Sequence, residues 1–154
     1  MMLTVRAYEK TDWTAIEQIH DSAWAIELKL AGLEESFLPL EVSAEREGLL
    51  AYPGLFVAEA GQRIAGFAAC TEEELAWLYV DPSYMRKGIG RCLSEYALRQ
   101  FPGIRFVEAL KGNEPARKLY EGLGFTVVSI ETGRMPGNEE FTVEVYSMEK
   151  INLL

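Results

Sequence analysis

The residues best suited to chemistry form a short basic segment with two glycines. The segment consists of Met85, Arg86, Lys87, Gly88, Ile89, Gly90 and Arg91. An apolar strand pattern at 75–80 precedes it, and a helix pattern with one apolar face follows it from Ile89 to Phe101. The free backbone N–H groups and the dipole of a helix N-terminus favour negative charge, and glycine lets a ligand approach the backbone closely. The segment therefore predicts a phosphate or pyrophosphate site.

The same segment also fits an ordinary tight turn with exposed basic side chains. Three basic residues in the six positions 86–91 of a chain with net charge −9 favour anion binding over that alternative. The segment matches neither the P-loop pattern, which ends in Gly-Lys-Ser/Thr, nor the G-x-G-x-x-G dinucleotide pattern. An ATP site is therefore disfavoured.

Three further positions carry groups that can do chemistry. Asn113 begins a helix pattern, where it can act as an N-cap. Tyr120 lies on the apolar face of that helix and also fits a core tyrosine with a bonded hydroxyl. Glu73 belongs to the acidic run 72–74, which fits a solvated turn as well as a catalytic carboxylate. His20, the only histidine, lies on the apolar stripe of an earlier helix, so we expect it to be packed and hydrogen-bonded rather than catalytic.

Length and composition predict one globular domain spanning residues 1–154. The chain is 49% hydrophobic and 25% charged, as globular proteins are, and its net charge of −9 argues against a nucleic-acid partner. Because it has neither an apolar run of membrane-spanning length nor a signal-peptide pattern, we expect a cytoplasmic protein without a membrane partner. Cys70 and Cys92 lack metal-ligand spacing, so we expect them to pack in the core and expect no metal site.

The elements that must position these groups alternate between strand and helix periodicity. Strands are predicted at 3–7, 55–59, 64–71, 75–80, 104–109, 125–132 and 141–150. Helices are predicted from about 13 to Gly32, at 41–50, at 89–101 and from Asn113 to about 122, with Thr11 or Asp12 capping the first. Because a helix separates strands 75–80 and 104–109, that pair should be parallel. The pattern is that of an α/β protein with a mixed sheet.

Two stretches together resemble the GNAT superfamily of acyl-CoA-dependent N-acetyltransferases. The first, LYVDPSYMRKGIGRCL, has Gly88 and Gly90 where that family has its pyrophosphate loop. The second, NEPARKLYEGLGF, matches the pattern N-x-x-A-x-x-L-Y-x-x-x-G-F at Asn113, Ala116, Leu119, Tyr120, Gly124 and Phe125. Two motifs in this order, separated by a strand, are far more specific than either alone. One departure is Met85, which stands where the family has Gln or Arg.

The resemblance implies a mostly antiparallel mixed sheet with a splayed central parallel strand pair, flanked by about four helices. It also implies that acetyl-CoA is the co-substrate. The pyrophosphate would bind the backbone of 85–91, and the pantetheine would lie along Leu78, Tyr79 and Val80. A backbone N–H near Leu78 would polarise the acetyl carbonyl. Asn113 would contact the cofactor.

For catalysis, the resemblance implies that Tyr120 protonates the departing thiolate and that Glu73 acts as general base. The acceptor would lie between residues 24–50 and the last two strands. Trp24, Phe37 and Tyr52 would either line that pocket or simply pack. The family's strand edges often pair between subunits, so a homodimer is plausible.

The function implied is an acetyl-CoA-dependent N-acetyltransferase. It would transfer acetyl directly, within a ternary complex, to an amine on a small molecule or a peptide. The acidic balance of the chain mildly favours a cationic acceptor. The alternative is a non-catalytic acyl-CoA-binding or sensing module on the same fold.

Overall fold

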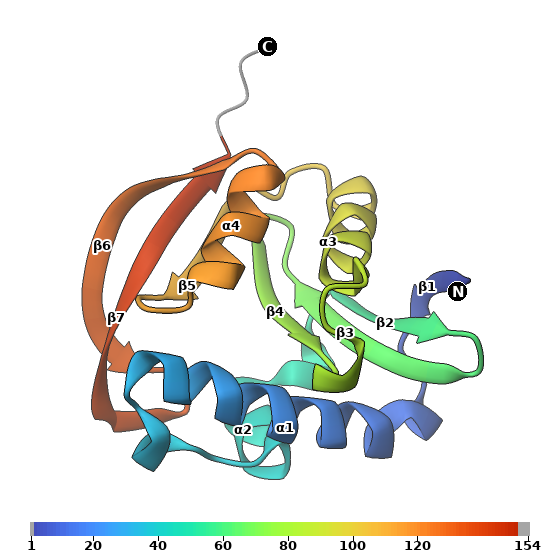
Figure 1. Cartoon of the computed structure of the whole chain (residues 1–154), viewed down its shortest axis with the longest axis horizontal. Coiled ribbons are helices and arrows are strands. Elements are labelled where there is room, and N and C mark those ends of the chain that lie inside the picture. The colour runs from blue at the N-terminus through green and yellow to red at the C-terminus, as the bar shows by residue number, and fades with distance from the viewer. Residues whose placement is uncertain (1, 151–154) are drawn as a thin grey trace.

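A single seven-stranded sheet organises the molecule (Figure 1). The computed structural model describes residues 2–150. The strands are β1 Leu3–Ala7, β2 Gly54–Ala60, β3 Arg63–Cys70, β4 Glu74–Val80, β5 Phe106–Leu110, β6 Phe125–Met135 and β7 Asn138–Lys150. Their order in the sheet is β1-β2-β3-β4-β5-β7-β6, and every neighbouring pair is antiparallel except β4 and β5. The predicted α/β class with a mostly antiparallel sheet is confirmed.

Four α-helices cover the two faces of this sheet. They are α1 Trp13–Ala31, α2 Leu40–Glu47, α3 Ile89–Gln100 and α4 Glu114–Gly122. Side chains of alternate strand residues point to opposite faces, so Phe56 packs with the cluster beneath α3 and α4, whereas Val57 packs beneath α1 and α2. A third cluster joins Leu28 near the end of α1 to the hairpin of β6 and β7. The apolar stripes predicted from the sequence are therefore the packed faces.

The parallel pair β4–β5 is short, and its strands then diverge. The two strands pair only at Glu74 with Phe106 and at Leu75 with Val107. Beyond this point β4 continues to pair with β3 as far as Val80, and β5 continues with β7 as far as Leu110. Figure 1 shows the two strands separating, with α1 running across the open end. The divergence leaves the facing edges of β4 and β5 without a strand partner.

Several local predictions need correction. The last hairpin is longer than predicted, because β6 continues to Met135 and β7 begins at Asn138. Asp12 precedes α1, but its side chain does not cap that helix; its carboxylate accepts hydrogen bonds from the Arg6 guanidinium and from the Glu9 backbone N–H. Cys70 is fully buried, as predicted, but Cys92 is only partly buried. Within residues 2–150, no helix is both long enough and apolar enough to span a membrane.

Candidate active site

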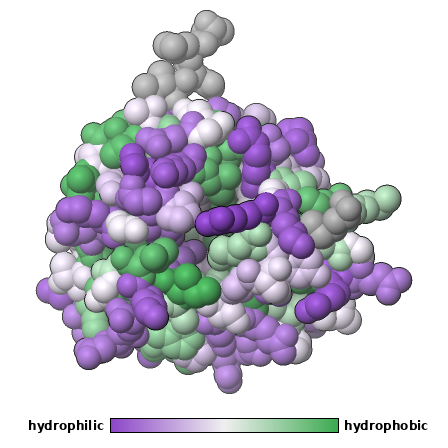
Figure 2. Space-filling view, in the orientation of Figure 1, coloured by the Kyte–Doolittle hydropathy of each residue, from purple (hydrophilic) through white to green (hydrophobic). Residues whose placement is uncertain are grey.

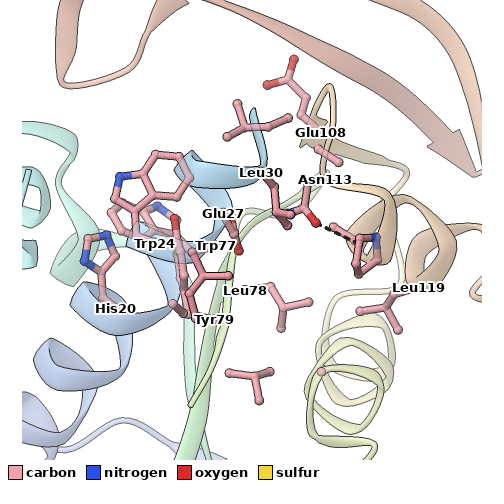
Figure 3. A pocket seen from close by; sticks show the side chains of 18 of the residues that line it. His20, Trp24, Glu27, Leu30, Trp77, Leu78, Tyr79, Glu108, Asn113 and Leu119 are labelled. Carbon is pink, nitrogen blue, oxygen red and sulfur yellow. Dashed lines mark hydrogen bonds between the residues drawn. The ribbon is translucent and has the colours of Figure 1, made fainter. Parts of the chain in front are cut away.

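A cavity of about 630 Å³ fills the space where β4 and β5 diverge. Both strands line it, as do α1, the segment leading into α3, α4 and the hairpin of β6 and β7. Figure 3 shows side chains from these separate elements converging on one space. The divergence of β4 and β5, which the resemblance implied, therefore produces a cavity that is lined by residues far apart in the sequence.

One end of the cavity is formed by the predicted anion segment, which we call the loop end. It comprises Met85, Arg86, Gly88, Ile89, Gly90 and Arg91. Arg86 and Gly88 have φ values of 64° and 79°, and Gly88 directly precedes the first turn of α3. Left-handed residues next to a helix N-terminus turn backbone N–H groups toward a common point, an arrangement that binds anions. The loop end thus has the backbone form and the positive charge that a pyrophosphate requires.

The individual residues of this segment have different roles. A side chain at Gly88 would meet no atom within 4 Å, so this position opens onto free space. At Gly90, a Cβ atom would lie 3.3 Å from Leu119 and 3.5 Å from Val80, so the missing side chain lets α3 pack between β4 and α4. The Lys87 side chain does not line the cavity; its ammonium lies 5.8 Å from the centre of the Tyr84 ring.

The remaining predicted cofactor residues also line the cavity, from both of the diverging strands' sides. Leu78, Tyr79 and Val80 line the cavity from the part of β4 that has separated from β5. The side chain of Asn113 is buried and caps α4, with its Oδ1 accepting from the Ala116 backbone N–H at 3.3 Å. The structure thus brings these residues and the loop end into one site.

Tyr120 reaches the same cavity from α4. Only 7% of the residue is exposed, and its ring packs edge-on against Phe125. Burial raises the pKa of the Tyr120 hydroxyl, and the charge of Glu27 raises it further. The hydroxyl therefore keeps its proton at neutral pH, and it lies in a wall of the cavity.

The structure does not bring Glu73 into this site. Glu73 is exposed and lies just before β4, at the end where β4 and β5 are still joined. Its backbone carbonyl accepts hydrogen bonds from the N–H groups of Arg105 and Phe106, at 2.8 Å and 3.0 Å. Its side chain is not part of the cavity wall. The geometry therefore gives no support to Glu73 as a base that acts within this cavity.

The opposite end of the cavity, which we call the acceptor end, is aromatic and acidic. It comprises His20, Trp24, Glu27, Glu47, Trp77 and Tyr79, whereas Glu108 lines the cavity separately, from β5. Of the three aromatic residues predicted either to line the pocket or to pack, Trp24 lines it, whereas Phe37 packs with Leu28 and Tyr52 lies against Trp77 on the α2 side. His20 is 2% exposed, and its Nδ1 lies 2.9 Å from Asp21 Oδ1, as expected for a packed histidine.

The sequence reasoning missed both carboxyl groups of the acceptor end, those of Glu27 and Glu47, and also Glu108. Glu27 did carry a signal, because it continues the series Ile16, His20 and Ala23 on the buried stripe of α1 at helical spacing. Burial raises the pKa of Glu27 to about 8. Burial, together with the charge of Glu139, raises the pKa of Glu47 to about 7. The clue in the sequence was therefore the charged residue Glu27 within the apolar stripe of α1.

These shifts predict how stability depends on pH. Between pH 4.5 and about 7 the folded chain holds a proton on Glu47 that the unfolded chain has released, so this group lowers the free energy of unfolding as pH rises. We therefore expect Glu47→Gln to be more stable than the wild type at pH 8, with little difference near pH 4.5. Urea unfolding at both pH values measures this, with exposed Glu45→Gln on the same helix as control. An equal difference at both pH values would refute the expectation.

Comparisons with known proteins agree with this geometry. The family model described as an acetyltransferase (GNAT) domain matches residues 52–127. The peptidyl-lysine N-acetyltransferase YiaC of Escherichia coli (strain K12) is 27% identical over 127 residues, which is 80% of this chain and 84% of that protein. The [ribosomal protein bS18]-alanine N-acetyltransferase of Salmonella typhimurium is 26% identical over 147 residues, covering 88% of each chain.

Solved structures show the same fold. The ribosomal-protein-S18-alanine N-acetyltransferase of Escherichia coli superposes with a TM-score of 0.70 at 24% identity, covering 99% of this chain and 97% of that one. The structure of yncA from Salmonella typhimurium, solved with its cofactor acetyl-CoA, has a TM-score of 0.70 at 20% identity and covers 99% and 95%.

Proposed function

Because the chain belongs to the GNAT superfamily and is an acetyltransferase, we propose that it transfers the acetyl group of acetyl-CoA directly to an amine. Both substrates are held together in a ternary complex. The observation that carries this proposal is the single cavity that joins the basic loop end to the acidic acceptor end. Holding two reactants in one site removes most of the entropic cost of their meeting. The acceptor is an amine on a small molecule or a peptide, in keeping with the lysine and alanine substrates named for the relatives.

The residues present fit coenzyme A at the loop end. The left-handed backbone at Arg86 and Gly88 and the N-terminus of α3 would hold the pyrophosphate, with Arg86 and Arg91 adding positive charge. The unpaired edge of β4 at Leu78–Val80 would bind the pantetheine arm as an added strand. Met85 contributes backbone to this segment, so the absence of the family's Gln or Arg side chain leaves the backbone contacts intact.

Tyr120 is the proposed acid on the thiolate side. Its raised pKa keeps the hydroxyl protonated, so it can donate a proton to the sulfur as the thiolate leaves. The bound thioester supplies the activated acetyl group. The buried position of Tyr120 in the cavity wall supports this role over that of a plain core tyrosine.

Initial-rate kinetics test direct transfer. We expect double-reciprocal plots against acetyl-CoA to intersect when the amine concentration is varied, because both substrates must be bound at once. Parallel lines would indicate an acetylated enzyme and would contradict the ternary complex. Tight acetyl-CoA binding without turnover of any amine would instead favour the sensing module.

A further inference from the structure

The two ends of the cavity carry opposite charge. Within residues 2–150, Arg86 and Arg91 are the only arginines that line the cavity, and no lysine lines it. Both arginines lie at the loop end. The acceptor end presents two carboxyl groups, on Glu27 and Glu47, and the exposed Glu108 lines the cavity from β5. Burial raises the pKa of Glu27 and of Glu47; a cation bound beside them favours their ionised forms, whereas an anion disfavours those forms further. The acceptor end is thus built for a positively charged group.

Glu27 occupies the central position at this end. Its charge raises the pKa of both Tyr79 and Tyr120, so its carboxyl group acts on both hydroxyls through space, and all three residues line the same cavity. Burial is the single cause of its own raised pKa, so no hydrogen bond or positive charge within residues 2–150 compensates the carboxylate. Figure 3 shows it between the aromatic side chains of Trp24 and Tyr79 and that of Leu30. The Glu27 carboxyl group, which lines the same cavity as Tyr120, is therefore available to bind a ligand.

The surroundings of Glu27 on α1 are apolar. Ile26 and Leu30 line the cavity and yet are 42% and 51% exposed, so they form an apolar lip at its mouth. Figure 2 shows hydrophobic side chains gathered over α1 on this face. The rings of Trp24 and Tyr79 meet edge to face with their centres 6.1 Å apart, which completes an aromatic wall. Such a wall favours both an alkyl chain and a cation.

We propose that the acceptor binds as an alkylammonium with no carboxylate next to its amine, and that Glu27 holds this ammonium and accepts its proton. The alkyl stem lies against Ile26 and Leu30. This inference rests on the proposed function, because it names the substrate class and the proton acceptor of the same site. Glu47, whose charge acts on Tyr79 as that of Glu27 does, disfavours an acceptor that carries a free carboxylate beside its amine.

The proton balance of the transfer is complete with these residues. Glu27 loses its own proton to solvent when the ammonium binds, because a neighbouring cation stabilises the carboxylate. The ammonium then gives one proton to Glu27, which leaves a neutral amine whose lone pair attacks the thioester carbonyl. As the N–C bond forms and the C–S bond breaks, the nitrogen loses its second proton to solvent water and the sulfur gains one from Tyr120. Tyr120 then regains a proton from Glu27, so the proton lost to water is the one released for each turnover.

The acidity of Glu27 suits this exchange. An alkylammonium has a pKa of about 10, so a carboxyl group with a pKa of about 8 faces a gap of about two units instead of about six. The other titratable groups around this space are His20, Glu47, Tyr79, Glu108 and Tyr120. Because Glu47 has a pKa of about 7, Glu47→Gln must be measured alongside Glu27→Gln. The comparison separates the effects of the two carboxyl groups on the pH dependence.

Binding without acetyl-CoA provides the first test. The indole N–H signals of the three tryptophans can be followed by NMR while butylamine or butyrate is added at pH 7. Trp24 and Trp77 line the cavity and Trp13 does not. We expect butylammonium, but not butyrate, to shift the first two signals and to leave Trp13 unchanged. Glu27→Gln should weaken butylammonium about tenfold, the order expected for one charge-assisted contact, whereas Glu17→Gln on the same helix should not.

Turnover provides the second test. The acceptors are butylamine, Nα-acetyl-lysine amide, alanine amide and free alanine, where the two amides distinguish a side-chain amine from a peptide N-terminus. We expect kcat/KM for Glu27→Gln to fall about tenfold at pH 7 and to recover toward pH 10, where the amine is already neutral. Urea unfolding at pH 8 should find this variant at least as stable as the wild type, since a neutral side chain replaces a buried carboxylate.

The outcomes separate this inference from the proposed function. Equal binding of butyrate and butylammonium, or equal use of alanine and alanine amide, would overturn the acceptor class. Full activity of Glu27→Gln at pH 7 would overturn its role as proton acceptor, even though transfer itself would then be established. Absence of turnover with every amine, with ammonium binding intact, would count against the proposed function and not against the ammonium site.

Discussion

Replacing Gly88 with glutamate is expected to weaken acetyl-CoA binding by at least about a hundredfold, equivalent to about 3 kcal/mol. Gly88 has a φ of 79° at the start of α3, and its missing side chain faces open space at the loop end of the cavity. A carboxylate there would add bulk and negative charge where the phosphates would bind, and it would oppose the favourable dipole of α3. Isothermal titration calorimetry with acetyl-CoA measures the change directly.

The chain offers a matched control for this variant. Gly61, in the turn between β2 and β3, has a φ of 65°, and a Cβ there would also meet no atom within 4 Å. Gly61→Glu therefore imposes the same backbone strain and the same charge away from the cavity. We expect it to bind acetyl-CoA like the wild type. If Gly88→Glu also bound with unchanged affinity, the loop end would not be the pyrophosphate site.

Replacing Tyr120 with phenylalanine is expected to lower kcat about a hundredfold while the KM for acetyl-CoA changes little. The substitution removes the proton donor to the leaving sulfur, and loss of one general acid costs on the order of a hundredfold or more. The ring and its packing against Phe125 remain, so the fold should not change. Steady-state kinetics and thermal unfolding of the same preparations measure both quantities.

Tyr96→Phe provides the comparison for Tyr120→Phe. Tyr96 is a partly buried tyrosine on α3 whose ring packs against Phe56, outside the cavity. Its loss of a hydroxyl should leave kcat unchanged. An unchanged kcat for Tyr120→Phe would make that residue structural. If kcat stayed the same and the KM for acetyl-CoA rose about a hundredfold, Tyr120 would instead be assigned to cofactor binding.

Much of the fold was predictable because local signals and tertiary packing agree. The alternation in Leu3–Ala7 and the apolar stripe of α1 correspond to faces that are packed in the structure. The end of α1 was predictable too, because Gly32 has the left-handed conformation that ends helices. The extension of β6 to Met135 could not be predicted from the sequence, because its exposed residues show no alternation of polar and apolar side chains. Only their backbone pairing with β7 makes them part of the strand.

The loop end was predictable for a different reason. Its residues are contiguous, so the charge and backbone freedom of Arg86–Arg91 can be recognised without knowing what lies opposite. Glu27, the proposed base, could not be recognised in this way. Counting along the sequence placed Glu73 near β4, but only the three-dimensional splay determines which end of β4 faces the cavity. Glu27 is some fifty residues away, and it reaches the site because α1 crosses the open end of the splay.

The central claim is that this chain moves an acetyl group from acetyl-CoA to an amine, and release of the CoA thiol tests it most directly. The panel comprises butylamine, lysine and alanine amides, a polyamine and an aminoglycoside, with Gly88→Glu as the inactive enzyme. Free Cys70 and Cys92 require an enzyme-only blank. We expect thiol release that needs both the amine and an intact loop end, and that is greatest for amines without a free carboxylate. No release above the blank with any amine, from protein that binds acetyl-CoA, would contradict the account.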